Sequence, residues 1–399
     1  MKNVAIIGTA GVPGRYGGFE TLAHNLVLSL NKTYNLTVYN SKKTYSKEER
    51  PSTWQGARLV YLPLSANGFQ SIIYDAISII HALFFADILI ILGVSGGIFI
   101  PIVRLFKNKK VIVNIDGLEW RRDKWSKPVK EFLHFSEKMA VRFSDATVTD
   151  NAMIKRYVGR YYNTTSLQIE YGADHVIPKK FSDETLQKFP FLQKDYAFSL
   201  ARIEPENNVH VTLEAFSRMP DKQLVFVGNW DVSIYGKSLK EKYSKFKNIH
   251  IIDPIYEQEP LDEIRSNCEI YIHGHSAGGT NPSLVEAMML KLPVFSFDVN
   301  FNRATTHEQA IFFKNADDLV KKILETDEEK LKQVASKLEI KAKQMYTWQL
   351  VVTKYHNAIQ AFDYNYKKKH LQSWISTLPR EQLINLGLTH LTNSKNFYE

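Results

Sequence analysis

A stretch of small residues near position 280 has the composition of an anion-binding loop. It follows a short apolar run, Glu269 to His273, and ends in Gly278 and Gly279 before Thr280-Asn281-Pro282. Asn281 suits the N-cap of a helix and Pro282 its first turn. The N–H groups at a helix start lack intrahelical partners, and the helix dipole is positive there, so such a loop can hold a phosphate.

Glu286 falls in the second turn of the helix that this loop opens. A carboxylate has two oxygens and can accept hydrogen bonds from two neighbouring hydroxyl groups at once. The alternative is a solvated helix glutamate, because most glutamates in proteins are exposed.

A second glycine-rich loop lies near the start of the chain. The apolar strand Asn3 to Gly8 runs into Thr9 to Gly18, after which a helix begins near Glu20. The glycines alone could indicate a dinucleotide site, but such a site needs an acidic residue at the end of the second strand. That strand, Leu36 to Tyr39, ends in Asn40-Ser41-Lys42-Lys43. The sequence therefore argues against NAD binding.

Two carboxylates follow a third apolar strand, Val111 to Asp116. They are Asp116 itself and Glu119, with Arg121 and Arg122 directly after them. The carboxyl ends of parallel strands are where α/β proteins place ligand groups. The alternative for Glu119 is an ion pair with Arg122 in one helical turn.

These motifs resemble those of the GT4 family of retaining glycosyltransferases, which have the GT-B fold. Val285-Glu286-Ala287-Met288 matches the end of the family's donor-binding motif. The strings GGTNPSLxEAM, GTAGVPxxYGGFET and DGLEW resemble a subgroup of the rhamnosyltransferase type. Gly278 stands where most of the family has a first glutamate, and Arg202 matches the arginine of a phosphate-binding string whose lysine is Asn207 here.

The resemblance implies roles for these residues. Glu286 would accept hydrogen bonds from the nucleotide ribose, and Arg202 would hold the donor diphosphate, since a guanidinium can grip two phosphate oxygens. Asp116 would orient or deprotonate the acceptor hydroxyl. The expected catalytic residues are Asp116, Arg202, Gly278 and Gly279; the expected donor-binding residues are Gly17, Gly18, Arg202, Gly279, Thr280, Asn281 and Glu286; the expected acceptor-side residues are Tyr16, Glu20, Asp116, Glu119 and Arg122.

The chain of 399 residues is long enough for two domains. Alternating strands and helices in both halves predict an α/β fold, a GT-B arrangement of two Rossmann-like domains that each hold a parallel sheet, with the active cleft between them. The expected divisions are 1–176 on the acceptor side, 177–345 for the nucleotide sugar, 346–362 as a helix returning to the first domain, and 363–399 as a basic tail.

Composition indicates the cellular setting. The single cysteine, Cys268, excludes an intrachain disulfide, and the start of the chain leads straight into a strand. We therefore expect a cytoplasmic protein. The net charge of +9 favours anionic partners, and an expected helix over Phe99 to Lys110 mixes apolar and basic residues in a way that suits either an anionic membrane or half-burial. No nucleic-acid-binding signature is present.

The predicted function is transfer of a sugar, with retention of configuration, to a lipid-diphosphate-linked glycan in surface polysaccharide synthesis. The subgroup points to L-rhamnose from dTDP-rhamnose. No D-x-D carboxylate pair follows a strand, so neither a metal site nor a cofactor is expected. The alternatives are a donor such as UDP-glucose or UDP-N-acetylglucosamine, a nucleotide-sugar epimerase of the same architecture, and a non-catalytic sugar-nucleotide binding module.

Overall fold

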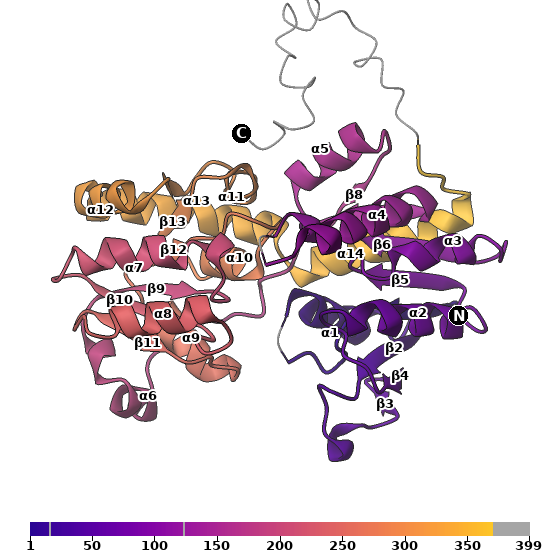
Figure 1. Ribbon diagram of the computed structural model, residues 1–399, viewed down its shortest axis with the longest axis horizontal. Coiled ribbons are helices and arrows are strands. Elements are labelled where there is room, and N and C mark those ends of the chain that lie inside the picture. Colours follow the sequence, from indigo (N-terminus) through magenta and orange to yellow (C-terminus); the bar gives the residue numbers. More distant parts are fainter. Residues whose placement is uncertain (16, 123, 370–399) are drawn as a thin grey trace, which may run out of the picture. The chain divides into compact units, whose positions relative to one another are not determined.

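The computed structural model describes residues 1–15, 17–122 and 124–369, and Figure 1 labels most of their helices and strands. The chain divides into two compact units. Unit 1 holds Met1–Trp120, Lys127–Ile169 and the chain from Val352 onward, and unit 2 holds Arg121–Ser126 and Glu170–Val351. Each unit is an α/β fold with its own sheet.

The sheet of unit 1 has the order β3-β4-β2-β1-β5-β6-β7-β8. Only the β3–β4 pair is antiparallel. The central strands are continuous apolar runs because helices cover both faces of a parallel sheet. The strands are β1 (Asn3–Ile7), β2 (Asn35–Ser41), β3 (Thr53–Trp54), β4 (Ala57–Leu62), β5 (Ile88–Leu92), β6 (Lys110–Asn114), β7 (Ala146–Thr149) and β8 (Leu167–Gln168).

Helices on the two faces of this sheet can be told apart by strand register. Tyr39 of β2 bonds His81 of α2, whereas Asn114 of β6 bonds Tyr355 of α14. Thr37, two residues before Tyr39, is paired across the sheet with Ala5, then Leu89, then Val111, so the side chains of Tyr39 and Val111 point to the same face. Val111 lies three residues before Asn114, and side chains alternate along a strand, so Asn114 points to the other face. The helices are α1 (Gly18–Leu30), α2 (Gln70–Ala82), α3 (Ile100–Val103), α4 (Lys127–Phe143), α5 (Ala152–Tyr161) and the later part of α14 (Trp348–Gln360).

The sheet of unit 2 is wholly parallel, in the order β11-β10-β9-β12-β13-β14. Its strands are β9 (Tyr196–Leu200), β10 (Gln223–Val227), β11 (Ile249–Ile252), β12 (Ile270–His273), β13 (Val294–Phe297) and β14 (Ile311–Phe313). Its helices are α6 (Asp183–Lys188), α7 (Val209–Ser217), α8 (Ile234–Tyr243), α9 (Gln258–Ser266), α10 (Pro282–Met289), α11 (Asn300–Thr306), α12 (Ala316–Glu325) and α13 (Glu328–Met345).

Alternate residues of the unit 2 strands enter two separate cores. Phe198 and Tyr271 join one core with Leu284 and Met288 of α10, and Ala197 joins the other with residues of α7 and α12. The helix that follows the predicted anion-binding loop is therefore fixed against the sheet by its own buried side chains.

The predicted helix over Phe99 to Lys110 is wrong in length. A 3-10 turn covers Gly97–Phe99, α3 covers only Ile100–Val103, and Lys110 is already the first residue of β6. The chain must leave the helix early enough to reach the start of that strand. Lys109 accordingly extends its Nζ to the carbonyl of Ala86, at 2.7 Å.

The predicted returning helix is α14, followed by a 3-10 turn at Ala361–Tyr364. Its residues Trp348, Val351, Val352 and Tyr355 are all buried, as their helical spacing predicts. The start of the predicted basic tail is fastened to unit 1, because Lys368 Nζ bonds Ser144 Oγ at 3.1 Å and Thr147 Oγ1 at 3.2 Å. The rest of that tail, residues 370–399, lies outside the described residues.

Candidate functional site

Glu286 lies in the second turn of α10, as predicted, and its side chain is held from both ends. Arg265 Nη1 donates to Oε2 at 2.5 Å, and His175 Nε2 lies 3.2 Å from Oε1. Only 14% of the Glu286 side chain is exposed. The alternative of a solvated helix glutamate is therefore wrong.

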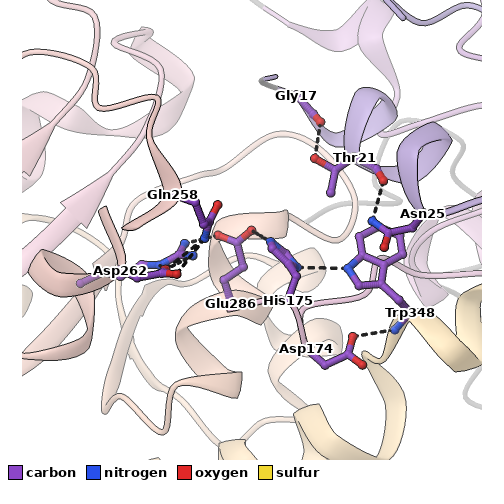
Figure 2. A network of polar contacts seen from close by, with 10 residues as sticks. Gly17, Thr21, Asn25, Asp174, His175, Gln258, Asp262, Glu286 and Trp348 are labelled. Carbon is purple, nitrogen blue, oxygen red and sulfur yellow. Dashed lines mark hydrogen bonds and ion pairs between the residues drawn. The ribbon is translucent and has the colours of Figure 1, made fainter. Parts of the chain in front are cut away.

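Both partners of Glu286 are themselves fixed in one polar network, which Figure 2 shows from Gln258 to Trp348. Arg265 Nε also donates to Asp262 Oδ1 at 2.7 Å, and Gln258 donates to the same carboxylate. On the other side, Trp348 Nε1 donates to His175 Nδ1 at 3.1 Å.

The indole N–H fixes the protonation of His175. An indole can only donate, so Nδ1 of His175 carries a lone pair and Nε2 carries the ring proton that points at Glu286. Trp348 is oriented in turn, since its backbone N–H donates to Asp174 Oδ1 at 2.7 Å. The imidazole therefore presents a neutral donor to the carboxylate.

The network leaves Glu286 charged with hydrogen-bonding capacity to spare. Burial opposes its ionisation, but the positive charge of Arg265 and the hydrogen bond from His175 outweigh burial and lower the pKa of Glu286 below its usual value. A carboxylate has about four acceptor positions. The two protein donors use one on each oxygen, so each oxygen can still accept a ligand hydroxyl.

The glycine-rich loop before α10 is shaped by backbone geometry at Gly278. Its φ is +123°, a conformation that L side chains rarely adopt, although a Cβ there would meet nothing closer than Asn281 Nδ2 at 3.7 Å. A glutamate at this position would be strained without being sterically blocked. Gly278 therefore suits the backbone conformation of this loop and also leaves the loop without a carboxylate at this position.

Neighbouring segments hold the start of this loop in place. The Ser276 amide and hydroxyl both bond the Glu206 carbonyl at 2.8 Å, and Asn302 Nδ2 donates to the His275 carbonyl at 2.8 Å. Further along, Thr280 is buried and Asn281 is the N-cap of α10 as predicted, although its side chain makes no capping bond.

Arg202 follows β9 and is exposed. Its side chain makes no hydrogen bond or ion pair with another residue of the described chain. Asn207, which stands where the family has a lysine, is buried and donates from Nδ2 to the Arg202 carbonyl at 2.8 Å. Asn207 thus fixes the backbone from which the Arg202 guanidinium extends.

Two histidines stack at the base of the loop. The rings of His273 and His275 are 4.4 Å apart and nearly parallel, at 10°. Burial lowers the pKa of His273 to about 3, and burial, with the charges of Arg202 and Arg122, also lowers the pKa of His275. Both rings are neutral near pH 7.

The glycine-rich loop of unit 1 is closed by its own glutamate. Glu20 Oε1 accepts the Ala10 amide at 2.8 Å and the Thr9 hydroxyl at 3.3 Å, and a Cβ on Gly17 would lie 2.0 Å from Glu20 Oε2. Burial raises the pKa of Glu20. Glu20, predicted on the acceptor side, therefore has a loop-stabilising position, and Gly18 begins α1 beside it.

Asn40, at the end of β2, holds the same loop. Its amide group exchanges two hydrogen bonds with the backbone of Val12, at 3.2 and 2.7 Å, and it packs against Gly11. The position that carries an acidic, ribose-binding residue in dinucleotide folds thus has a structural partner here.

Asp116 lies just beyond the carboxyl end of β6 with φ +58°, and its amide bonds Asn114 Oδ1 at 3.1 Å. It is near enough to Glu20 for its charge to contribute to the raised pKa of Glu20. Glu119 opens a 3-10 turn at Glu119–Arg121, and Arg122, in unit 2, lies 3.7 Å from Glu204 Oε2. Tyr16, predicted on the acceptor side, lies outside the described residues.

Two family models cover most of the chain. Residues 182–345 match the model described as glycosyl transferases group 1, and residues 1–174 match a domain of unknown function, DUF1972. The protein is a glycosyltransferase with the GT-B fold. The predictions of fold and enzyme class are confirmed. The match does not decide the rhamnosyltransferase subgroup.

Solved structures share the fold of this glycosyltransferase at low sequence identity. Sucrose-phosphate synthase from Thermosynechococcus elongatus has a TM-score of 0.77 and 13% identity over 92% of this chain and 100% of its own. Anabaena HepE in complex with UDP has a TM-score of 0.66 and 12% identity over 90% and 100%. A glycosyltransferase from Rickettsia africae has a TM-score of 0.67 and 13% identity over 90% and 98%. No curated protein matches the chain.

The sequence did not identify three residues that the structure of this glycosyltransferase shows in buried polar contacts or with a shifted pKa. Arg265 and His175 contact Glu286 but are separated from it in the sequence, so no local motif includes them. The only sequence signal is that Asp262 and Arg265 are three residues apart on a helix, a spacing at which opposite charges pair. Asp75 in α2 is buried against Gly96, and burial raises its pKa to about 8. Its signal was a lone carboxylate in an otherwise apolar helix.

Within the described part of the glycosyltransferase, no cluster of three or more His, Cys, Asp or Glu side chains is arranged to hold a metal ion. No helix among the described residues is both long enough and apolar enough to cross a bilayer.

Proposed function

We propose that this glycosyltransferase moves L-rhamnose, with retention of configuration, from dTDP-rhamnose to a lipid-diphosphate-linked glycan. The acceptor would begin a surface polysaccharide and would meet the enzyme at the cytoplasmic face of a membrane. A nucleotide-sugar donor is supported by the group 1 match over unit 2 and by similar folds solved with UDP and UDP-glucose. The rhamnosyl donor and the lipid-linked acceptor are supported by the subgroup motifs.

The fixed charge on Glu286 is the observation that carries the proposal. Arg265 and His175 hold the carboxylate in one orientation, keep it ionised and leave one acceptor position on each oxygen. This arrangement suits two vicinal ribose hydroxyls, because each can donate to a different oxygen. Pre-orientation by the network removes an ordering cost that binding would otherwise include.

Departure of the nucleotide diphosphate is the step that needs stabilisation. In this proposal the exposed guanidinium of Arg202 and the backbone amides of Gly279, Thr280 and Asn281 receive the negative charge as the sugar–phosphate bond breaks. His273 and His275 stay neutral and add no charge of their own. The acceptor hydroxyl then attacks from the face that the diphosphate leaves.

The acceptor side is assigned to residues among the first 122 of the chain, of which Arg122 belongs to unit 2. Asp116 is proposed to orient or deprotonate the acceptor hydroxyl, with Tyr16, Glu119 and Arg122 as further contacts. Glu20 contributes by shaping the loop that holds Gly17 and Gly18, which are proposed for the donor side, because Glu20 fills the space that a side chain on Gly17 would need.

The sugar is assigned from Gly278. A 6-deoxy sugar presents a methyl group where a hexose has a hydroxyl, and a carboxylate beside that methyl would lack a hydrogen-bond partner. Glucose linked to UDP is the second candidate, because the fold of HepE, solved with UDP-glucose, resembles this one.

A panel of nucleotide sugars tests the donor by thermal shift and by hydrolysis. A ligand at 100 times its dissociation constant adds about 2.7 kcal/mol of stability. The largest shift is expected with dTDP-rhamnose; a clear preference for UDP-glucose or UDP-N-acetylglucosamine would refute the rhamnosyl assignment. Epimer formation would indicate an epimerase, and binding without any turnover a binding module.

A further inference from the structure

The outward side of α2 is apolar along its whole length. Phe69, Ile73, Ile77, Ile80 and Phe84 are all exposed, Phe69 and Phe84 by 80% and 83%, and they follow one another at helical spacing. Asp75 is the only Asp, Glu, Lys or Arg within the helix, and it is buried. A helix that faces water usually carries charged residues on its outer side. This one does not.

The stripe belongs to a wider layer on one face of the unit 1 sheet. Gly96 packs against Asp75 of α2, since a Cβ on Gly96 would lie 2.6 Å from the Asp75 Cβ, and Ser136 of α4 bonds the Val94 carbonyl and the Ile98 amide of the same loop. The bond from Lys109 Nζ to the Ala86 carbonyl joins the turn after α3 to the turn after α2. Thus α2, α3 and α4 form a continuous layer.

More exposed apolar side chains lie on α3, the turn after it and α4. They are Ile102, Leu105, Phe106 and Phe135. We call these residues, together with the five of the α2 stripe, the apolar face. Large apolar patches on a protein surface mark interaction sites more often than chance.

The charged residues around the apolar face are mostly basic. The exposed charged residues of α4 are Lys127, Glu131, Lys138 and Arg142, and Lys107 is exposed after α3. On the other flank, the Arg58 guanidinium lies over the ring of Phe85, 5.8 Å from its centroid. Cations around an apolar surface fit the headgroups and the outer acyl region of an anionic bilayer.

We propose that the apolar face binds the surface of an anionic lipid bilayer, with its isoleucine and phenylalanine side chains among the lipids and Lys107, Lys127, Lys138 and Arg142 at the headgroups. A second copy of the chain fits less well. A two-fold dimer through this face would bring the same cations of both copies together, whereas the bilayer supplies the opposite charge.

This proposal deepens the proposed function, since a lipid-linked acceptor would lie in the same bilayer, but binding itself needs no glycan. The test therefore uses vesicles without any acceptor. Full-length protein is floated with vesicles of phosphatidylcholine alone and with an equal mixture of phosphatidylcholine and phosphatidylglycerol. Strong binding is expected only to the mixture, with release in high salt because surface charges are screened.

Two variants separate the apolar and the basic contributions. I73E/I77E and K138E/R142E should each lower binding to the mixed vesicles by about tenfold or more. The matched control is Ile234→Glu, since Ile234 is an exposed apolar helix residue of unit 2; it should bind as the unaltered protein does. Unchanged unfolding temperature and nucleotide-sugar hydrolysis in solution would show that the variants are folded.

The proposal is overturned by any of three results: equal binding to both kinds of vesicle, no binding to either, or binding by I73E/I77E equal to that of the unaltered protein. A dimer seen by light scattering that I73E/I77E dissociates would assign the apolar face to a second copy instead. Failure of dTDP-rhamnose as a donor would leave this result untouched.

Discussion

The glycine-rich loops of the two units place a largely buried glutamate in opposite electrostatic settings. In unit 1, Glu20 has a backbone amide and a hydroxyl as partners, and burial raises its pKa. In unit 2, Glu286 has a guanidinium, and its pKa is lowered despite burial. Burial alone favours the neutral acid, and a cation in contact reverses this preference. The first carboxylate closes a loop, whereas the second stays charged for a ligand.

Removing the cation should largely abolish this difference. Arg265→Leu leaves Asp262 and Glu286 buried without their shared partner, and breaking a buried pair costs about 3–5 kcal/mol of unfolding free energy. Chemical denaturation measures it. Arg218→Leu is the control, because Arg218 also pairs with two carboxylates, Glu214 and Asp317, but at the surface; its loss should lower the unfolding free energy far less, because solvent screens exposed ion pairs. Equal losses in the two variants would refute the importance of burial.

Replacing the arginine beside each loop should affect sugar transfer to different extents. Arg202→Ala is expected to lower transfer about a hundredfold, since loss of one donor to a developing negative charge costs roughly 3 kcal/mol. Arg15, in the loop of unit 1, is paired with Glu49. Arg15→Ala should change kcat/KM little. Steady-state kinetics with a fixed acceptor decides the point, and near-normal turnover by Arg202→Ala would remove that residue from the phosphate site.

Amide replacement tests the two glutamates directly. Glu286→Gln keeps the shape but removes the charge, so affinity for the free nucleotide diphosphate should weaken more than tenfold, given about 1.5–3 kcal/mol for hydrogen bonds to a charged group. Glu20→Gln should leave that affinity unchanged, because Glu20 bonds only the loop. Calorimetry measures the nucleotide diphosphate affinity of both variants. An equal loss of affinity in the two variants would contradict the prediction.

A buried carboxyl group with a raised pKa should make the protein less stable as the pH rises, the opposite of the effect of a carboxyl group with a lowered pKa. Asp75 of unit 1 has a folded pKa of about 8, above its usual value of 3.8. The folded protein therefore keeps a proton that the unfolded chain releases, and stability is lost as pH rises from about 4 to about 8. Asp75→Asn removes this loss. Its unfolding free energy should exceed that of the unaltered protein by an amount that grows with pH, by at most about 1.4 kcal/mol per unit. A gap constant with pH would contradict the raised pKa.

Local patterns in the sequence predict much of the fold and the positions of the loops. Apolar runs such as Val111 to Asp116 identify buried parallel strands, and Asn281-Pro282 marks the start of α10. The helix expected over Phe99 to Lys110 fails because periodicity does not reveal where the next strand must begin.

Long-range partners could not be predicted in the same way. The motif predicts the helix and turn of Glu286 correctly. The charge of Glu286, however, depends on Arg265 and His175, which only the tertiary fold brings close to it. The role of Glu20 likewise depends on the loop folding back onto the helix. Residue types show which groups can do chemistry, and packing decides which of them stay charged.

The division of the chain into units sets an order for folding during synthesis. Unit 2 is completed once residues up to Val351 have been made, whereas unit 1 takes its last segment from Val352 onward. Until then Asn114 lacks Tyr355, Tyr34 lacks His356, and Ser144 and Thr147 lack Lys368. Domains usually fold on the ribosome in the order of their synthesis. Here the N-terminal sheet lacks the contacts of α14 and Lys368 until the last part of the chain is made, so the C-terminal unit can reach its final structure first.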